Sequence, residues 1–559
     1  MLNKHWYYRV INGDFMFLGG ETMKKLLFIL PLLLSANLLF AVKPNLGEKL
    51  AKIQSFTYNA GSSPQSLDPA KVEGVPEGIF ARTLFETLVI SDDDDKLIPG
   101  VALSWESSSD YKTWTFHLRK DAKWSNGDPV TAHDFVFAWR RIVDPKTASP
   151  YASYLTYMKL KNAQAIINGK IKSDSLGIEA KDDYTLVLTL EDSVPFADLL
   201  TEMYVLSPVP KKLVEKLGDA WSEPHNIVGN GAYKLDSFIV NKDAKLSKNP
   251  HYWDASNVIL EKLTLLQIQN ESVAYTRYRS GALDVSTFPL ELFDKIKKEY
   301  PNELITGPSL CTYFYEFNVA KPPFNNANVR KALSLSLDRN IVTDKILKQG
   351  QIPAYTFAPP AITGAQAVVP PEWSKWDDKK RYEEAIKLLT EEGYSKNKPL
   401  TFTLLYNTNE GHKKLAIAAS SMWKKNLGGL VNVKLKNQEW KTFLSERRLG
   451  TQQMARAGWC SDYNEASSFL NAFLSDSSNN TSGFKDATYD SFIKAAYQAN
   501  TDEERANQYA LAEKFLYDNS IFLPVYFYTT TELMKPYIRG YKIKASRALY
   551  FKNVYILEH

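Results

Sequence analysis

Strand-like and helix-like segments alternate along this chain from one end to the other. Residues 114–118 show the period-two apolar pattern of a half-buried strand, and Asn126-Gly127 marks a turn after it. Residues 131–134 supply a capping-box start for a helix, and apolar positions between Val329 and Leu337 share one helical face. A chain of 559 residues with 44% apolar content is too large to fold around a single hydrophobic core, and no repeat or low-complexity linker is evident in it. The sequence therefore predicts an α/β protein of two or three closely packed domains.

An apolar run near the start predicts export. Leu26–Ala41 is almost wholly apolar, follows Met23-Lys24-Lys25 and precedes a polar stretch, which is the pattern of a secretory signal peptide at residues 23–41. A membrane anchor is the alternative, but the run is shorter than the roughly 20 residues that a span needs. The polar residues 1–22 fit no targeting pattern, so we expect Met23 to be the true start. No cysteine lies near the cleavage point, which favours a soluble periplasmic protein over a lipoprotein.

The chain contains two cysteines, Cys311 and Cys460. In an oxidising compartment an even cysteine count makes a disulfide the default, so the sequence predicts a bond between them. The chain-entropy model gives an upper limit of about 5 kcal/mol for closing so long a loop.

Both cysteines lie in segments that combine aromatic residues with carboxylates. One is residues 458–465, with Trp459, Asp462 and Glu465; the other is residues 311–316, with three aromatic residues and Glu316. A disulfide would hold the two segments side by side, so we expect them to form one binding site.

Several function classes find no support in the residues. The net charge of +5 is small for this length and no basic block stands out, so nucleic acid is not an expected partner. The sequence has no metal-binding histidine motif, no nucleophile elbow and no phosphate-binding loop, and we expect neither a metal, a cofactor nor a catalytic site. Asp92–Asp95 is interpreted as a solvated loop tip rather than a cation site.

A series of local motifs appears in the order found in one protein family. The motifs are Ser66-Leu67-Asp68-Pro69, Trp114–Arg119 with Trp124–Gly127, Gly229–Tyr233, Asn249–Trp253, Tyr278–Gly281 and Val329–Leu333 with Asp338-Arg339. With them the chain resembles the periplasmic oligopeptide-binding proteins of ABC importers, over essentially everything after the signal peptide.

The resemblance implies a three-domain periplasmic binding protein, in which two lobes of mixed sheets and flanking helices close on a hinge and an extra domain is added. It places a discontinuous domain I at residues 42–86, 211–310 and 530–559. Domain II is expected at residues 87–210 and domain III at residues 311–529.

The resemblance also suggests which residues bind the two ends of a peptide ligand. Asp462 matches the residue that receives the ligand's α-amino group, and a buried ammonium needs such a carboxylate; a solvated loop aspartate is the alternative. Arg447, Arg456 and His412 match cations for the ligand's carboxylate, as does Lys348 less firmly. For His412 an ordinary surface helix position stays open.

Sequence-tolerant capture requires that affinity come from the ligand's main chain. Gly458, Trp459 and Cys460 on one side, and the segment from Glu73 to Val75 on the other, are expected to pair with it. The resemblance adds residues that line side-chain pockets: Glu73, Tyr151, Glu316, Trp440, Trp459 and Tyr528. Trp440 and Trp459 are equally compatible with packing in the core.

These features predict a monomeric receptor, without catalysis, that binds peptides of about three to five residues and delivers them to an inner-membrane ABC permease. Two alternatives stay open. The same fold is compatible with a murein peptide, a dipeptide, a nickel complex or haem as cargo. An exported peptidase would need a nucleophile or metal that the sequence does not show.

Overall fold

The computed structural model describes Pro44 and residues 47–499 and 501–559. The expected start at Met23 and the signal peptide at residues 23–41 lie outside the described residues. Among the helices that are described, none has both the length and the hydropathy that crossing a membrane requires.

One sheet of eleven strands runs through the described chain. Its order is β15-β14-β16-β12-β17-β11-β1-β10-β9-β8, and β13 pairs with β17 beside this path. The strands are β1 (Ser55–Asn59), β8 (Tyr233–Ile239), β9 (Asp243–Lys248), β10 (Lys262–Leu266), β11 (Val285–Ser286), β12 (Leu304–Phe317), β13 (Ile352–Pro353), β14 (Leu400–Asn407), β15 (Val431–Gln438), β16 (Met454–Cys460) and β17 (Phe522–Met534).

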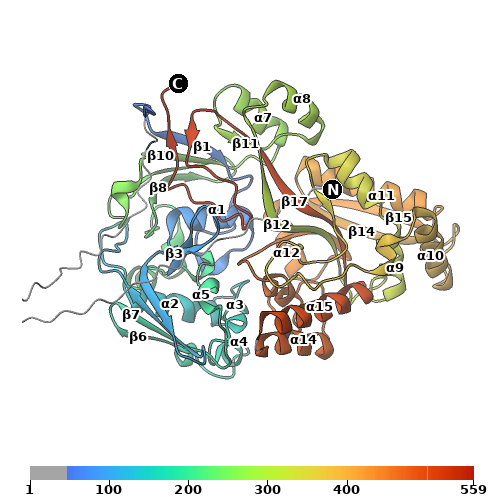
Figure 1. Cartoon of the computed structure of the whole chain (residues 1–559), viewed down its shortest axis with the longest axis horizontal. Helices are drawn as coiled ribbons and strands as arrows, with labels where there is room; N and C mark the ends of the chain where they lie inside the picture. The colour runs from blue at the N-terminus through green and yellow to red at the C-terminus, as the bar shows by residue number, and fades with distance from the viewer. Residues whose placement is uncertain (1–43, 45–46, 500) are drawn as a thin grey trace, which may run out of the picture. The chain divides into compact units, whose positions relative to one another are not determined.

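The two long strands β12 and β17 join two halves of the molecule. Their first pairing block joins Leu304–Pro308 to Thr529–Leu533, the second joins Thr312–Glu316 to Phe522–Phe527, and the register shifts between the blocks. Such an irregularity bends a strand and breaks its regular ladder. We call residues 47–303 and 535–559 the first lobe and residues 318–521 the second lobe; β12 and β17 run between them (Figure 1).

The first lobe carries a separate four-stranded antiparallel sheet of order β4-β5-β7-β6 and two small two-stranded sheets. Their strands are β2 (Val89–Ser91), β3 (Leu97–Pro99), β4 (Ala102–Ser107), β5 (Thr113–Leu118), β6 (Ile178–Asp182), β7 (Thr185–Thr189), β18 (Ile538–Arg539) and β19 (Tyr555–Ile556). The helices of this lobe are α1 (Val75–Leu84), α2 (Ala132–Val143), α3 (Tyr154–Tyr157), α4 (Ala163–Ile167), α5 (Ala197–Leu200), α6 (Lys211–Leu217), α7 (Glu271–Arg279) and α8 (Phe293–Glu299).

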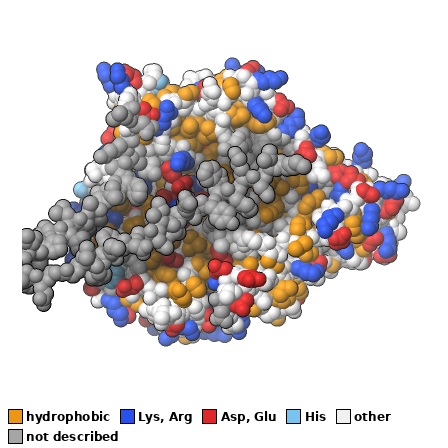
Figure 2. Space-filling view, viewed as in Figure 1, with side chains coloured by type: hydrophobic (Ala, Val, Ile, Leu, Met, Phe, Trp, Pro, Cys, Tyr) orange, Lys and Arg blue, Asp and Glu red, His pale blue; other side chains and the backbone are white. Residues whose placement is uncertain are grey.

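In the second lobe, helices flank the β14, β15 and β16 end of the large sheet. They are α9 (Ala327–Ser336), the π-helix η7 (Ile341–Leu347), α10 (Asp378–Glu391), α11 (Glu410–Asn426), α12 (Trp440–Arg448), α13 (Ser467–Leu470), α14 (Ala487–Gln498) and α15 (Asp502–Asp518). On the face drawn in Figure 2, basic and acidic side chains are mixed over the end of this lobe that carries α10 and α11.

The local predictions are confirmed where patterning was strong. The strand expected at residues 114–118 is β5, with alternating buried positions. The helix expected after Thr131 is α2, and the Asp134 carboxylate accepts the backbone N–H of Thr131 at 2.9 Å. The apolar face near Val329 is buried in α9.

The acidic loop tip differs from the sequence prediction. Asp95 accepts hydrogen bonds from the backbone and hydroxyl of Ser546 at 3.3 and 2.6 Å, and Asp93 pairs with Lys542 at 3.2 Å. A neighbouring C-terminal segment supplies the donors, so Asp92–Asp95 is only partly solvated. Over the residues that the structure covers, no group of acidic, His or Cys side chains is arranged to hold a metal ion.

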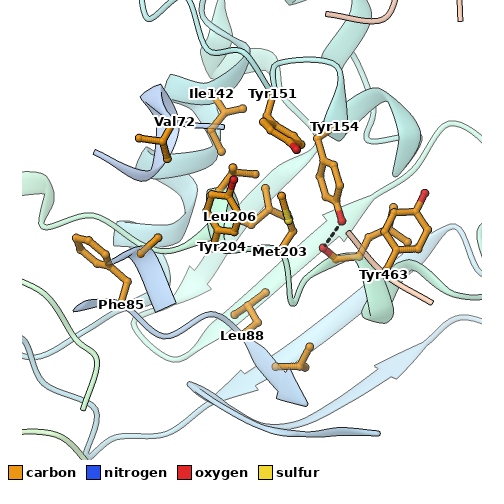
Figure 3. Packing of buried hydrophobic residues seen from close by; sticks show 14 of the residues in the cluster. Val72, Phe85, Leu88, Ile142, Tyr151, Tyr154, Met203, Tyr204, Leu206 and Tyr463 are labelled. Carbon is orange, nitrogen blue, oxygen red and sulfur yellow. Dashed lines mark hydrogen bonds between the residues drawn. The ribbon is translucent and has the colours of Figure 1, made fainter. Parts of the chain in front are cut away.

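Aromatic residues of both lobes meet in one buried cluster. Tyr151, Tyr154 and Tyr204 belong to the first lobe, and Tyr463 of the second lobe packs edge-on against Tyr154 with 6.2 Å between ring centroids (Figure 3). The Tyr154 hydroxyl donates to the Leu200 carbonyl at 3.0 Å. Edge-to-face pairs of this kind add to the burial energy, so the cluster favours contact between the lobes.

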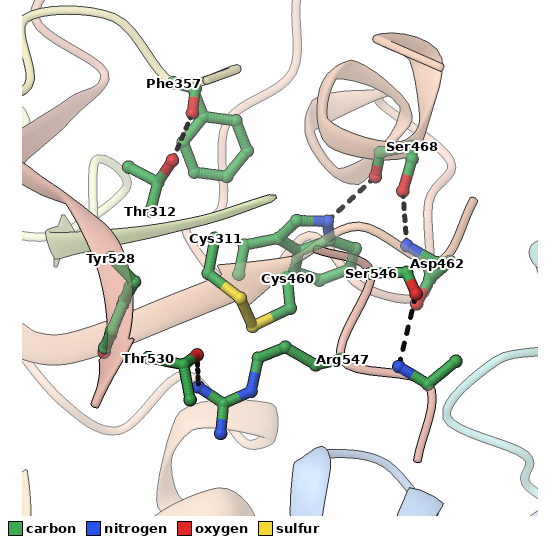
Figure 4. Close-up of a disulfide and its surroundings, with 12 residues drawn as sticks. Cys311, Thr312, Phe357, Cys460, Asp462, Ser468, Tyr528, Thr530, Ser546 and Arg547 are labelled. Atoms are coloured by element: carbon green, nitrogen blue, oxygen red, sulfur yellow. Dashed lines mark hydrogen bonds between the residues drawn. A yellow bond between two sulfur atoms is a disulfide. The ribbon is translucent and has the colours of Figure 1, made fainter. Parts of the chain in front are cut away.

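The predicted disulfide is present and joins β12 to β16 (Figure 4). Cys311 and Cys460 lie directly opposite each other in the antiparallel ladder, and Cys311 lies within the register shift of β12 between Pro308 and Thr312. The bond therefore attaches the joining strand to the second lobe beside the point where the strand bends.

Replacing both cysteines by alanine should lower the free energy of unfolding by about 2–4 kcal/mol, because the unfolded chain regains the freedom of a long loop. Urea unfolding of the double variant and of the native protein, with and without reductant, measures this. An unchanged unfolding midpoint would show that the bond does not stabilise the fold.

Candidate functional site

A cavity of about 480 Å³ lies between the lobes, a volume typical of sites for small ligands. Twelve of the predicted ligand-binding residues line it. They are Glu73, Val75, Tyr151, His412, Trp440, Arg447, Arg456, Gly458, Trp459, Cys460, Asp462 and Tyr528. Residues from segments more than 300 positions apart in sequence therefore meet in one place.

One wall of the cavity offers free main chain. Strand β16 pairs with β12 along its whole length, but β14 pairs with it only at Met454 and Ala455. In the described structure the other edge of residues 456–460 has no strand partner, as backbone pairing of an extended ligand requires. Gly458 suits this edge, because a Cβ there would lie 3.2 Å from the Tyr528 hydroxyl oxygen and 3.3 Å from an Arg456 nitrogen.

Asp462 follows this strand and presents its carboxylate to the cavity. The Tyr151 hydroxyl donates to it at 3.5 Å, and its backbone N–H donates to the Ser468 hydroxyl at 2.7 Å. Burial raises the pKa of Asp462 to about 7, against the opposing effects of nearby Arg82 and of Tyr151. A buried carboxylate of this kind is stabilised by a cation that pairs with it.

Arg456, on the same strand, supplies positive charge six positions earlier. It donates to the Tyr528 hydroxyl at 2.8 Å and to the Asn407 side chain at 3.4 Å, and its guanidinium lies 5.0 Å from the Tyr313 ring centroid. No described carboxylate forms an ion pair with it. Asp462 lies six positions after Arg456 and two residues beyond the end of β16, and six positions of fully extended strand span about 20 Å at most.

His412 lies beside Arg456 but supplies no charge there. Burial first, and then the positive charge of Arg456, lower the pKa of the imidazole well below its usual value. Its Nδ1 is buried without a hydrogen-bond partner in the described structure. The neutral ring can exchange a hydrogen bond with a ligand, and its predicted role as a cation is not what this environment favours.

Arg447 lines the cavity with its charge already compensated. Its guanidinium contacts the Glu316 carboxylate at 2.7 and 3.3 Å, and Thr481 donates to the same carboxylate at 2.7 Å. Glu316 is 5% exposed and does not line the cavity, in contrast to its predicted place in a pocket wall. The hydrogen bonds from Arg447 and Thr481 hold the Glu316 carboxylate in this buried position.

Lys348 also lies elsewhere. Its ammonium pairs with Asp294 at 3.0 Å in a separate, solvent-exposed groove lined by α8 and η7. Lys348 is not among the residues that line the cavity.

Two predicted aromatic residues make specific hydrogen bonds. The Trp459 indole donates to the Ser468 carbonyl at 2.8 Å, and the Trp440 indole donates to Glu77 of the first lobe at 3.1 Å. Glu73 pairs with Arg448 across the same gap. Each residue thus both borders the cavity and fixes the protein around it.

Some cavity residues carried no recognisable signal in the sequence. Arg82, Glu271, Glu532 and Arg547 all line the cavity. They come from α1, α7, β17 and the C-terminal segment, whose motifs show nothing unusual at these positions. Only the meeting of distant segments brings them to the site.

A family model for bacterial extracellular solute-binding proteins, family 5, matches residues 96–481. The chain belongs to this family. The periplasmic oligopeptide-binding protein of Haemophilus influenzae is 51% identical over 96% of this chain and 99% of its own length.

Solved structures match the whole architecture. The Haemophilus influenzae protein in complex with the peptide RPPGFSPFR has a TM-score of 0.90 at 52% identity, covering 91% of this chain and 100% of that one. The murein tripeptide-binding protein of Escherichia coli has a TM-score of 0.89 at 42% identity, covering 91% of this chain and 100% of that one.

The lobes of this structure are not in the arrangement of a known open form. An unliganded open murein tripeptide-binding protein, also 42% identical, has a TM-score of only 0.65, covering 92% of this chain and 99% of that one. Hydrogen bonds between the lobes agree with a closed arrangement; one of them, from Ser478 N–H to the Ser153 hydroxyl, measures 2.7 Å.

Replacing Glu316 by alanine should destabilise the protein by about 2 kcal/mol, because the partly buried Arg447, whose side chain is 18% exposed, would lose its counter-charge. Thermal or urea unfolding measures this. Lys348→Ala, which breaks an exposed ion pair, is the matched control and should cost less than about 1 kcal/mol. Equal effects of the two changes would contradict the buried-pair assignment.

Proposed function

We propose that this protein is a periplasmic receptor that captures short peptides between its lobes and delivers them to an inner-membrane ABC permease, without catalysing a reaction. The observation that carries this proposal is the unpaired edge of β16 between Arg456 and Asp462. It combines main-chain hydrogen-bonding groups with a cation and a carboxylate. A peptide with two free ends offers the complementary groups in the same order.

The two ends of the ligand have different partners in this proposal. The α-ammonium pairs with Asp462, whose burial is costly without a cation. The α-carboxylate of a ligand of up to about five or six extended residues reaches Arg456, since six positions of extended strand span about 20 Å at most. Arg447 contributes less charge to such a ligand, because Glu316 already binds it.

Closure of the lobes on a peptide links ligand binding to delivery, because the permease would meet the closed form. A ligand that contacts both lobes favours the closed arrangement over the open one by its differential affinity. We propose the domains expected from the sequence for this motion: domain I at 42–86, 211–310 and 530–559, domain II at 87–210, and domain III at 311–529. The separate four-stranded sheet formed within residues 102–189 supports the second of these.

We also propose that a signal peptide at residues 23–41 directs export and is then cleaved. The mature protein is proposed to be a monomer. The names of two relatives support a periplasmic location, since the Haemophilus influenzae oligopeptide-binding protein and the open murein tripeptide-binding protein are both named as periplasmic.

A specialised cargo is the second candidate, because a murein tripeptide-binding protein has the same fold. Titration calorimetry with refolded, ligand-stripped protein separates the candidates. A pentapeptide with free ends should give strong binding, whereas a murein tripeptide or haem should bind weakly. Binding of only a murein tripeptide, a dipeptide or haem would assign a specialised importer, and release of cleaved fragments would assign a peptidase.

Asp462→Asn should weaken binding of a free-amine peptide by about 2–4 kcal/mol, roughly 30- to 1,000-fold in Kd, because the ligand's ammonium loses its counter-charge. The N-acetylated peptide is the matched ligand, and the substitution should hardly change its weaker binding. If the variant still prefers the free-amine peptide as strongly as the native protein does, Asp462 is not the amine site.

Arg456→Gln tests the other end in the same way. Amidation of the peptide's C-terminus should weaken binding to the native protein far more than binding to the variant, because both changes remove the same charge pair. Calorimetry on the four combinations gives the coupling energy. A coupling energy near zero would place the ligand's carboxylate elsewhere.

A further inference from the structure

Trp440 of the second lobe is seated in a notch of the first lobe. Its indole N–H donates to Oε1 of Glu77 at 3.1 Å. Gly74 forms the floor of the notch: a Cβ there would lie 2.9 Å from the Trp440 ring and 2.9 Å from Oε2 of Glu77. The ring therefore packs directly on the Gly74 backbone, and only a closed arrangement allows this contact.

Glu77 is enclosed by this contact in an unusual way for a carboxylate. The side chain is 1% exposed, and Oε1 accepts the Trp440 indole and, at 3.2 Å, the Gln65 backbone N–H. Oε2 is buried and has no hydrogen-bond donor among the described residues. A bare, buried carboxylate oxygen is costly, and protonation removes most of that cost.

The charged and titratable neighbours of Glu77 do not supply a counter-ion. Glu73 adds a negative charge nearby, and Arg448 of α12 is engaged with that residue. Arg82, one helical turn further along α1, lies over the Tyr204 ring, 5.0 Å from its centroid. No described lysine or arginine forms an ion pair with Glu77.

We propose that Trp440 and Glu77 form a latch between the lobes, and that closing on a peptide takes up a proton at the Glu77 carboxyl. The proposal rests on the receptor function above and names two positioning residues for it. In the open form Trp440 leaves the notch, water reaches Glu77 and the carboxyl ionises. In the closed form the neutral acid accepts the indole hydrogen bond.

The expected pKa values support this geometry and give the sign of the effect. Burial raises the pKa of Glu77 from 4.5 to about 8 in the closed structure. The closed form therefore binds one more proton than the open form at pH values between these two limits. Affinity should fall as pH rises through this window, by up to about tenfold per pH unit.

Glu271 is a second carboxyl at the seam between the lobes. It accepts a hydrogen bond from Asn409 of the second lobe at 3.2 Å, and burial raises its pKa to about 7. Its contribution adds to that of Glu77, so a single substitution should remove part of the proton uptake and not all of it.

The experiment is titration calorimetry of penta-alanine with free ends at pH 6.5, in buffers with different ionisation heats. The slope of observed heat against buffer heat gives the number of protons taken up. Glu77→Gln keeps an acceptor for Trp440 but cannot ionise. It should take up about one proton less than the native protein and flatten the pH dependence of Kd between pH 5.5 and 8.

Two further variants separate the latch from a general structural role. Trp440→Phe keeps a ring in the notch but loses the donor, and it should bind about 3- to 10-fold more weakly with proton uptake retained. Glu410→Gln removes a carboxylate that also bonds across the seam, to Ser272 and Asn270, and whose charge helps to raise the pKa of Glu271; it should therefore reduce proton uptake much less than Glu77→Gln does. Thermal unfolding verifies that each variant is folded.

The outcomes separate the latch from the receptor function. No proton uptake by the native protein, or the same uptake in Glu77→Gln, overturns the latch while peptide binding itself still stands. If the native protein binds no free-ended peptide, the receptor function falls and the latch falls with it.

Discussion

Antiparallel pairing of β12 with β17 is the interaction on which the rest of the structure depends. These two strands join the lobes, and their register shifts twice, between Pro308 and Thr312 and again between Tyr313 and Phe314. Such shifts interrupt the backbone ladder and bend the strands at the point where one lobe passes into the other. The disulfide at Cys311 keeps β16 attached beside this bend.

The free-energy cost of burying an unpaired charge explains how the charged side chains of the cavity are arranged. Arg447 and Glu316 satisfy each other, so their pair is part of the protein wall. Asp462 and Arg456 lie on one extended segment and have no such partners in the described structure. Two separated charges of opposite sign are what the proposed ligand, a peptide with two charged ends, would complement.

The sequence predicted local elements well, and it pointed to many of the residues that line the cavity. The capping box at Thr131 and Asp134 and the period-two strand at residues 114–118 are local signals, because their stabilising contacts come from neighbours in the chain. Twelve of the residues that the ordered motifs suggested line the cavity, and their roles in ligand binding stay predictions. Glu316 and Lys348 lie outside the cavity lining and burial favours a neutral His412, because a side chain's direction and surroundings depend on segments far away in sequence.

The sequence alone determined the α/β class, the pairing of the two cysteines and the residue types that a peptide site needs. Only the tertiary structure decided which charges are left without partners, and that Glu77, Glu271, Arg82 and Arg547 belong to the site or its seam. The physical reason is that ionisation and hydrogen bonding depend on burial and on neighbours within a few ångströms. Those neighbours are set by how the two lobes meet, not by their order along the chain.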